Sequence, residues 1–150
     1  FLWKDQGRRD LSSETGHYAW ADRDYEILAK HGFGVAREGI PWPMVDLGHG
    51  YDFTIIEPFL EAQRKHKVVP IWDLCHYGYP EQYEPFSEAF PEQFASYCRA
   101  AAEHVARDHY GPLFFTPINE ITFFGFAAGE WGWAAPNGKN RRRGTGCGWR

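Results

Sequence analysis

The sequence lacks the features that mark several classes of protein. No apolar run approaches the roughly 20 residues that a membrane-spanning helix requires. Its 3 cysteines, Cys75, Cys98 and Cys147, are an odd number without CxxC spacing, which argues against a disulfide framework and favours a reducing compartment. The N-terminus has neither an initiating Met nor the charged start of a signal peptide, so we expect a cut end. We therefore expect a cytoplasmic protein without a membrane span.

The charge of the chain also argues against one kind of partner. A formal net charge of −4 gives no electrostatic basis for binding nucleic acid. Basic residues concentrate in the segment 139–150, which is rich in Gly and has no apolar period, and we expect an irregular, solvated tail there. We expect residues 1–138 to form one domain. Aromatic residues make up 18% of the chain, which suits a thick core or stacking surfaces for flat ligands such as sugars.

The apolar pattern predicts strands that alternate with helices. Short apolar runs, partly β-branched or aromatic, predict strands at 1–3, 33–40, 67–74 and 113–120. Apolar residues at helical spacing predict helices at 20–30, at about 54–66 and from Pro91 to about Val105. A fourth helix is expected soon after Glu120. Strands that alternate with helices of this length imply parallel pairing, so the predicted fold class is α/β.

Two architectures fit this order, an open doubly wound sheet and a (β/α)₈ TIM barrel. The first βα turn has no G-x-G-x-x-G, which removes the usual reason to prefer a dinucleotide-binding sheet. In a barrel, the C-terminal ends of the strands carry the chemistry. Here those ends carry Arg37 and Trp42, then Asp73 and His76, then Asn119 and Glu120. Since a full barrel needs about 250 residues, we predict the N-terminal half of a TIM barrel, with about four βα units.

The stretch from Leu113 to Glu120 carries the clearest functional hypothesis. Either Asn119 or Glu120 alone is more typical of a solvated loop. Apolar neighbours on both sides of Glu120 would favour the protonated carboxyl group that a general acid needs. An amide that donates to a sugar hydroxyl, beside an acid that protonates the leaving oxygen, suits cleavage of a glycosidic bond.

Other polar and aromatic side chains have less specific meanings. Arg37 lies in an otherwise apolar strand, so it must meet a carboxylate, either a structural one or a catalytic nucleophile. His76 alone would be taken as a loop histidine, and with no partner at metal-ligand spacing it gives no reason to expect zinc. Trp42 and Trp131 could each lie in the core or at the rim of a site, and the glycines around Trp131 favour the rim. Nothing in the sequence indicates a cofactor or a metal.

Three motifs, taken in order, resemble the second, third and fourth strand ends of family-1-like glycoside hydrolases. They are Arg37-x-x-Ile40-x-Trp42, Asp73-Leu74-Cys75-His76-Tyr77-Gly78-Tyr79-Pro80 and Thr116-Pro117-Ile118-Asn119-Glu120. Phe1-Leu2-Trp3 is also similar to the first strand of that family, and Gly129-Glu130-Trp131-Gly132-Trp133 to its loop after strand four. The resemblance covers nearly all of residues 1–138, and it implies a TIM barrel of the retaining clan that includes beta-glucosidases and beta-galactosidases.

The resemblance implies roles for the residues at the strand ends. Glu120 would be the general acid/base, Asn119 would contact the sugar 2-hydroxyl and His76 a neighbouring hydroxyl, and Arg37 would hold the nucleophile. Trp42 and Trp131 would contribute to binding the substrate. The nucleophile of that family is a Glu on strand seven, which this sequence does not contain. The expected parent is thus a retaining O-glycoside hydrolase of carbohydrate metabolism, with this chain as its acid/base half and a glycoside as its partner.

Departures from the family pattern keep other functions open. Ile121 stands where a Pro usually follows the Asn-Glu pair, Pro117 replaces a Thr, and the glutamine-containing motif after strand one is not recognisable. One alternative is a non-catalytic carbohydrate-binding barrel. Another is a TIM-barrel enzyme for a phosphosugar, although its phosphate site would lie after strands seven and eight. A half barrel also leaves unpaired strand edges, so we expect self-association through these edges.

Overall fold

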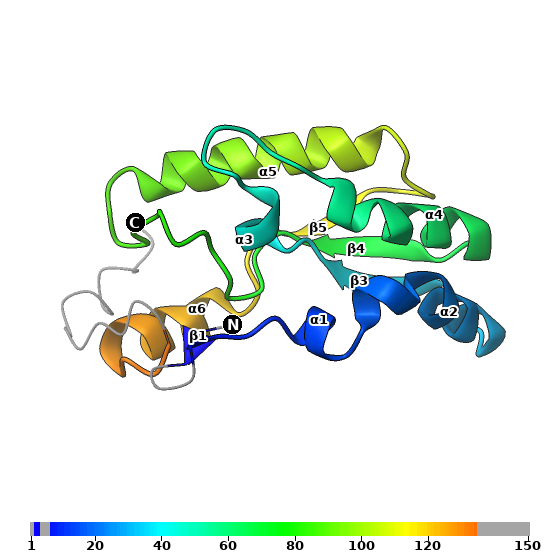
Figure 1. The fold of residues 1–150 in the computed structure, drawn as a ribbon, viewed down its shortest axis with the longest axis horizontal. Coiled ribbons are helices and arrows are strands. Elements are labelled where there is room, and N and C mark those ends of the chain that lie inside the picture. Colours follow the sequence, from blue (N-terminus) through cyan, green and yellow to red (C-terminus); the bar gives the residue numbers. More distant parts are fainter. Residues whose placement is uncertain (1, 4–6, 135–150) are drawn as a thin grey trace.

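The structure, a computed structural model, describes residues 2–3 and 7–134. The expected tail at 139–150 and the last residues of the expected domain lie outside the described residues. Within them, three parallel strands form a sheet in the order β3 (Val35–Gly39), β4 (Val69–Asp73) and β5 (Phe114–Thr116). Figure 1 shows this sheet beside three long helices, α2 (His17–Lys30), α4 (Glu57–His66) and α5 (Phe90–Ala106). The prediction of a parallel α/β fold is confirmed.

The long helices begin where local chemistry allows a helix to begin. Pro58 and Pro91 occupy the first turns of α4 and α5, where a missing N–H costs nothing. A short 3₁₀ turn, Thr54–Ile56, precedes α4 and follows Asp52, whose side chain accepts the N–H of Thr54 at 2.9 Å. The predicted helices at 54–66 and from Pro91 are therefore confirmed to within a few residues, and α2 begins three residues earlier than predicted.

Three short helices near the ends of the strands complete the description. α1 (Leu11–Glu14) and α3 (Trp42–Val45) fall in segments that the sequence pattern left as loops. The predicted fourth helix is confirmed as α6 (Ile121–Phe124), which continues into a π-helix, Gly125–Glu130, labelled η2. In Figure 1 the arrowheads of the parallel strands point toward the side of the molecule where α3 and α6 lie.

The prediction that residues 1–3 form the first strand of the parallel sheet is wrong. Leu2–Trp3 (β1) pairs antiparallel with Gly7–Arg8 (β2) in a separate two-stranded sheet. Antiparallel strands can be joined by a very short connection, whereas parallel strands need a long crossover. Leu2–Trp3 has a partner strand only four residues further along the chain and therefore forms the local pair.

The central strand β4 contains a proline, which usually disfavours a central strand. Val69 donates its N–H toward β3, to the carbonyl of Gly34 at 2.9 Å. Leu74 donates toward the other side, to the carbonyl of Thr116 at 2.9 Å. Because N–H groups alternate in direction along a strand, Pro70 lacks the donor that would face β5. β5 pairs only with residues that follow Pro70, so the proline removes no hydrogen bond from the ladder.

The helix-covered face of the sheet holds a connected polar network inside the core. The hydroxyl of Tyr25 on α2 donates to Oε2 of Glu38 at 3.0 Å, and Nε2 of Gln63 on α4 donates to the Tyr25 hydroxyl at 2.9 Å. His17 lies against Glu38 (3.2 Å) and Asp24 (2.6 Å). These contacts fasten two helices to β3. No helix among the described residues is long and apolar enough to cross a membrane.

Candidate active site

The C-terminal ends of the three parallel strands are held in line beyond the strands themselves. After β4 and β5, the N–H of Leu74 donates to Thr116 O and the N–H of Asn119 donates to Cys75 O, both at 2.9 Å. Continued pairing fixes the loop that carries His76 against the loop that carries Asn119. The strand ends that the sequence pattern singled out therefore lie side by side.

Arg37 joins all three strand ends. Its Nη2 donates to Oδ2 of Asp73 and to Oδ1 of Asn119, each at 2.6 Å. The expectation that Arg37 meets a carboxylate is confirmed, and the carboxylate is Asp73, whose side chain is only 2% exposed. A nearly buried carboxylate needs such a partner, because an unpaired charge in this position would be strongly destabilising.

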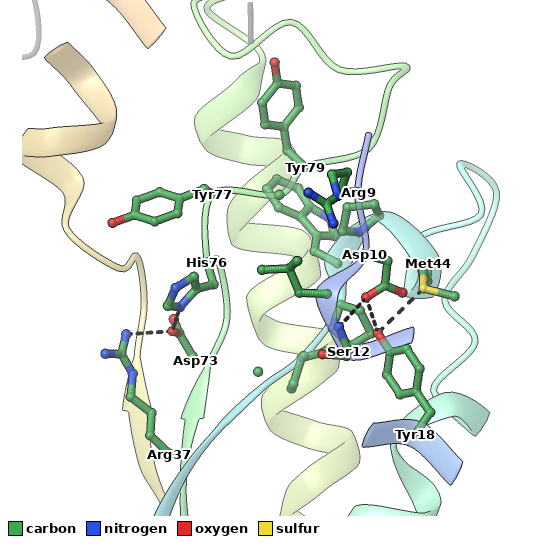
Figure 2. Close-up of a pocket in the computed structure, with 17 residues that line it drawn as sticks. Arg9, Asp10, Ser12, Tyr18, Arg37, Met44, Asp73, His76, Tyr77 and Tyr79 are labelled. Carbon is green, nitrogen blue, oxygen red and sulfur yellow. Dashed lines mark hydrogen bonds and ion pairs between the residues drawn. The ribbon is translucent and has the colours of Figure 1, made fainter. Parts of the chain in front are cut away.

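Asp73 also fixes the orientation of His76. Nδ1 of the imidazole lies 2.7 Å from Oδ2 of Asp73 (Figure 2), and because a carboxylate only accepts hydrogen bonds, Nδ1 carries a proton. In the neutral ring Nε2 is then an acceptor. The amide nitrogen of Asn119 lies 3.5 Å from this Nε2, while the amide oxygen of Asn119 is held by Arg37. The donor on Asn119 and the acceptor on His76 thus meet in a long hydrogen bond.

Glu120 directly precedes α6, at its N-cap position, in a left-handed backbone conformation with φ of 44° and ψ of 51°. Its Oε2 accepts a hydrogen bond from the hydroxyl of Tyr77. The expectation that apolar neighbours bury Glu120 is wrong, because Glu120, Ile121 and Phe123 are all exposed. The chain leaves the sheet at this turn, so Asn119 faces inward and Glu120 faces outward.

The two tryptophans that were expected at the site differ in their surroundings. Trp42 is 1% exposed, stacks on Tyr97 with ring centroids 4.8 Å apart, and donates its Nε1 to Asp46 at 3.1 Å. The indole therefore packs in the core, while Trp42 also contributes to the lining of the pocket described below, and a role for Trp42 in binding substrate remains a prediction. Trp131 is 43% exposed, which agrees with the expected rim position. A role for Trp131 in binding remains a prediction.

Trp131 belongs to a group of exposed rings that we call the aromatic cluster. Its ring centroid lies 5.7 Å from that of Phe126 and 4.6 Å from that of Trp133, and Phe123 meets it edge-on at 6.4 Å. All four rings come from α6, η2 and the turn that follows. Flat exposed rings of this kind are suited to stacking on a sugar or an aryl group.

A pocket of about 880 Å³ opens beside the strand ends. Figure 2 shows Arg37, Asp73 and His76 on one side of it and Asp10 and Tyr18 on the other. Sequence reasoning missed this second wall, although an aspartate directly before Leu11 is a recognisable N-cap for α1. Among the residues that the structure describes, neither Asn119 nor Glu120 lines the pocket.

Tyr77 is a further residue of the candidate site to which the sequence pattern assigned no role. It lines the pocket and donates to Glu120, so it connects the pocket to the candidate acid. Its contact with Glu120 joins positions 43 apart in the chain, which no local pattern could reveal. Within the described part of the chain, no group of three or more His, Cys, Asp or Glu side chains could hold a metal ion.

Solved structures share this fold at low sequence identity. The chain superposes with a TM-score of 0.75 on the AHE enzyme from Alicyclobacillus herbarius (20% identity), the family 1 beta-glucosidase from Thermotoga maritima (18%) and a psychrophilic beta-glucosidase from Micrococcus antarcticus (16%). Each match covers 85% of this chain and 28–30% of the other. No family model and no curated protein matches the sequence. The chain is a partial TIM barrel that spans about 30% of the length of these enzymes.

Proposed function

We propose that this chain carries the acid/base side of a retaining O-glycoside hydrolase of the beta-glucosidase type, with Glu120 as the acid/base. The observation that supports this proposal is the convergence of Arg37, His76 and Asn119 at three neighbouring strand ends, directly before Glu120. The fold that the chain shares with beta-glucosidases supports the same reading. Because the chain spans about 30% of their length, the activity of a longer protein is part of the proposal.

The polar groups beside the pocket suit a sugar. Arg37 occupies the oxygen of the Asn119 amide, so the nitrogen of that amide is the group left to donate to a hydroxyl. Nε2 of His76 accepts from the same nitrogen through a hydrogen bond of 3.5 Å, which is long enough for a sugar hydroxyl to replace it. A donor beside an acceptor matches neighbouring hydroxyls, each of which both donates and accepts. The aromatic cluster would then contact the leaving group through Trp131.

Glu120 would protonate the glycosidic oxygen and later activate water. A retaining mechanism also needs a nucleophilic carboxylate about 5–5.5 Å from the acid. We propose that this nucleophile lies outside the 150 residues, since Asp73, the carboxylate at the strand ends, is committed to Arg37 and His76. The chain alone would therefore bind a sugar without hydrolysing it.

Binding of deoxynojirimycin, a cationic sugar mimic that is bound to the Thermotoga maritima enzyme in one structure, tests this proposal. We expect NMR titration of the chain to show shifts at the amides of the β4 and β5 loops. Asn119→Ala and His76→Ala should each weaken binding about tenfold, as expected for the loss of one hydrogen bond to a sugar hydroxyl. His109→Ala, in the exposed loop after α5, is the matched control. Shifts that are absent, or equal in all variants, would contradict the proposal.

An aryl β-glucoside separates catalysis from binding. We expect no turnover of this glucoside by the chain. If the wild-type chain did hydrolyse it and Glu120→Gln did not, a second catalytic carboxylate would lie within the 150 residues. The exposed position of Glu120 favours one alternative, a non-catalytic sugar-binding barrel. That alternative predicts that a longer protein containing this chain binds deoxynojirimycin but is inert both as wild type and as Glu120→Gln.

A further inference from the structure

Two residues with a strained, left-handed backbone contact each other through their side chains. Among the non-glycine residues that the structure describes, a left-handed backbone conformation occurs only at Lys67, Tyr77 and Glu120. Lys67 ends helix α4, where a left-handed residue is common. Tyr77 (φ 68°) and Glu120 (φ 44°) lie in different loops, and the hydroxyl of Tyr77 donates to Glu120. Strain of this kind persists where surrounding contacts over-determine it, often at functional sites.

The ring of Tyr77 is held from both sides. It meets His76 edge-on at 5.1 Å, and it packs against Phe123 at 5.9 Å and Phe124 at 6.0 Å, both on α6 just after Glu120. In Figure 2 the ring points away from Asp10 and Tyr18, so its hydroxyl is directed out of the pocket. The phenol thus connects the loop that carries His76 to α6, the helix that follows Glu120.

We propose that Tyr77 is a positioning residue for Glu120. The Tyr77 hydroxyl holds Oε2 of Glu120 in place and leaves Oε1 to exchange the proton with substrate. Among the described residues, the hydrogen bonds of this carboxylate involve Oε2 alone. The phenol donates to the ionised carboxylate, so it assists the state in which Glu120 acts as a base. This inference rests on the proposed role of Glu120, but the contact itself can be tested without substrate.

The phenol of Tyr77 provides the readout. Burial and the hydrogen bond to Glu120 raise the pKa of Tyr77 to about 12. Tyr83 is an internal control, because burial and its donation to Asp46 at 2.9 Å also raise the pKa of Tyr83 to about 12. Removal of the negative charge at Glu120 should therefore lower the pKa of Tyr77 and leave the pKa of Tyr83 unchanged.

The experiment is a pH titration of the chain with ¹³Cζ-labelled tyrosine, followed by NMR. Tyr77→Phe and Tyr83→Phe assign the two resonances, and Glu120→Gln removes the charge at nearly constant volume. We expect the Tyr77 midpoint to fall by at least one pH unit in Glu120→Gln while the Tyr83 midpoint stays. The Tyr77 shift at pH 7 should also differ between wild type and Glu120→Gln, which covers the case of unfolding in alkali. Identical Tyr77 shifts and midpoints in the two proteins would overturn the proposal.

Sugar binding separates this inference from the proposed function. Tyr77→Phe should bind deoxynojirimycin with an affinity within about twofold of wild type. The side chains that bind the sugar hydroxyls are unchanged in this variant, and Tyr77 acts through Glu120. A loss as large as that of His76→Ala would mean that Tyr77 itself binds the sugar, and would contradict the positioning role. If wild type does not bind while the tyrosine titrations behave as expected, the proposed function fails and the Tyr77–Glu120 contact stands.

Discussion

The two faces of the parallel sheet are built from alternate residues of the same strands, yet they meet different surroundings. On the helix-covered face, Glu38, Trp72 and Leu74 are buried beneath α2, α4 and α5. On the open face, Val35 is 52% exposed and Phe114 48% exposed, although both are apolar. Neighbouring side chains of one strand therefore differ in how much apolar surface folding removes from water.

The comparison shows which part of a barrel the chain supplies. A closed barrel fills its interior with apolar side chains from all its strands. The open face carries such side chains, and its C-terminal end carries Arg37 and Asp73, so it corresponds to the interior of a barrel, with the candidate site at the C-terminal ends of the strands. The helix-covered face corresponds to the outside of the barrel core and is complete among the described residues.

The largest expected effect comes from breaking the covered face. Trp72→Ala should lower the free energy of unfolding by about 3–5 kcal/mol, because the indole is fully buried and leaves a cavity. Phe114→Ala on the open face removes a similar ring that is half exposed, and should cost about 1 kcal/mol or less. Urea denaturation of the two variants measures the difference, and equal losses would mean that the faces do not differ.

A smaller effect concerns the polar network under the covered face. The hydrogen bond to Glu38, opposed by burial and assisted by Asp24, raises the pKa of His17 from 6.5 to about 9. A raised pKa stabilises the fold fully below about pH 6.5, and this stability is lost as the pH rises through 9. We expect a loss of about 1–2 kcal/mol across this window, since solvent screens part of the interaction.

Urea midpoints measured from pH 6 to pH 10 test this window. His17→Gln keeps a polar side chain without a titrating group, so its stability should change less over the same range. A wild type whose pH dependence matches that of His17→Gln would show that the imidazolium does not stabilise α2 against β3. His31→Gln, an exposed residue at the end of α2, serves as the control.

The smallest effect on stability is expected at the open face, where the readout is association. β5 is an edge strand, and Phe114 presents an exposed ring on it. We expect the chain to self-associate near 100 µM, with Phe114→Lys shifting it toward monomer while changing stability by less than about 0.5 kcal/mol. Sedimentation velocity measures this, and Trp20→Lys, at an exposed helix position, is the control. A monomeric wild type would contradict the expected self-association.

Local rules predicted the parts of the fold that local chemistry decides. Pro91 marked the start of α5 to within one residue, and the cost of an unpaired cation predicted a carboxylate partner for Arg37. Trp42 was not predictable in the same way, because its burial depends on Tyr97, which is distant in the sequence. The exposure of Glu120 was missed since apolar neighbours in sequence say nothing about the direction in which a turn leaves the sheet.

The left-handed backbone at Tyr77 and Glu120 has a consequence for how the protein can change. Each such residue costs about 1–2 kcal/mol that a glycine would not pay. Substitutions that stabilise the fold are therefore available at both loops, and each would remove a side chain from the candidate site. Selection for thermostability alone and selection for the site act in opposite directions at these two positions, so a library screened only for a higher melting temperature should lose Tyr77 and Glu120 early.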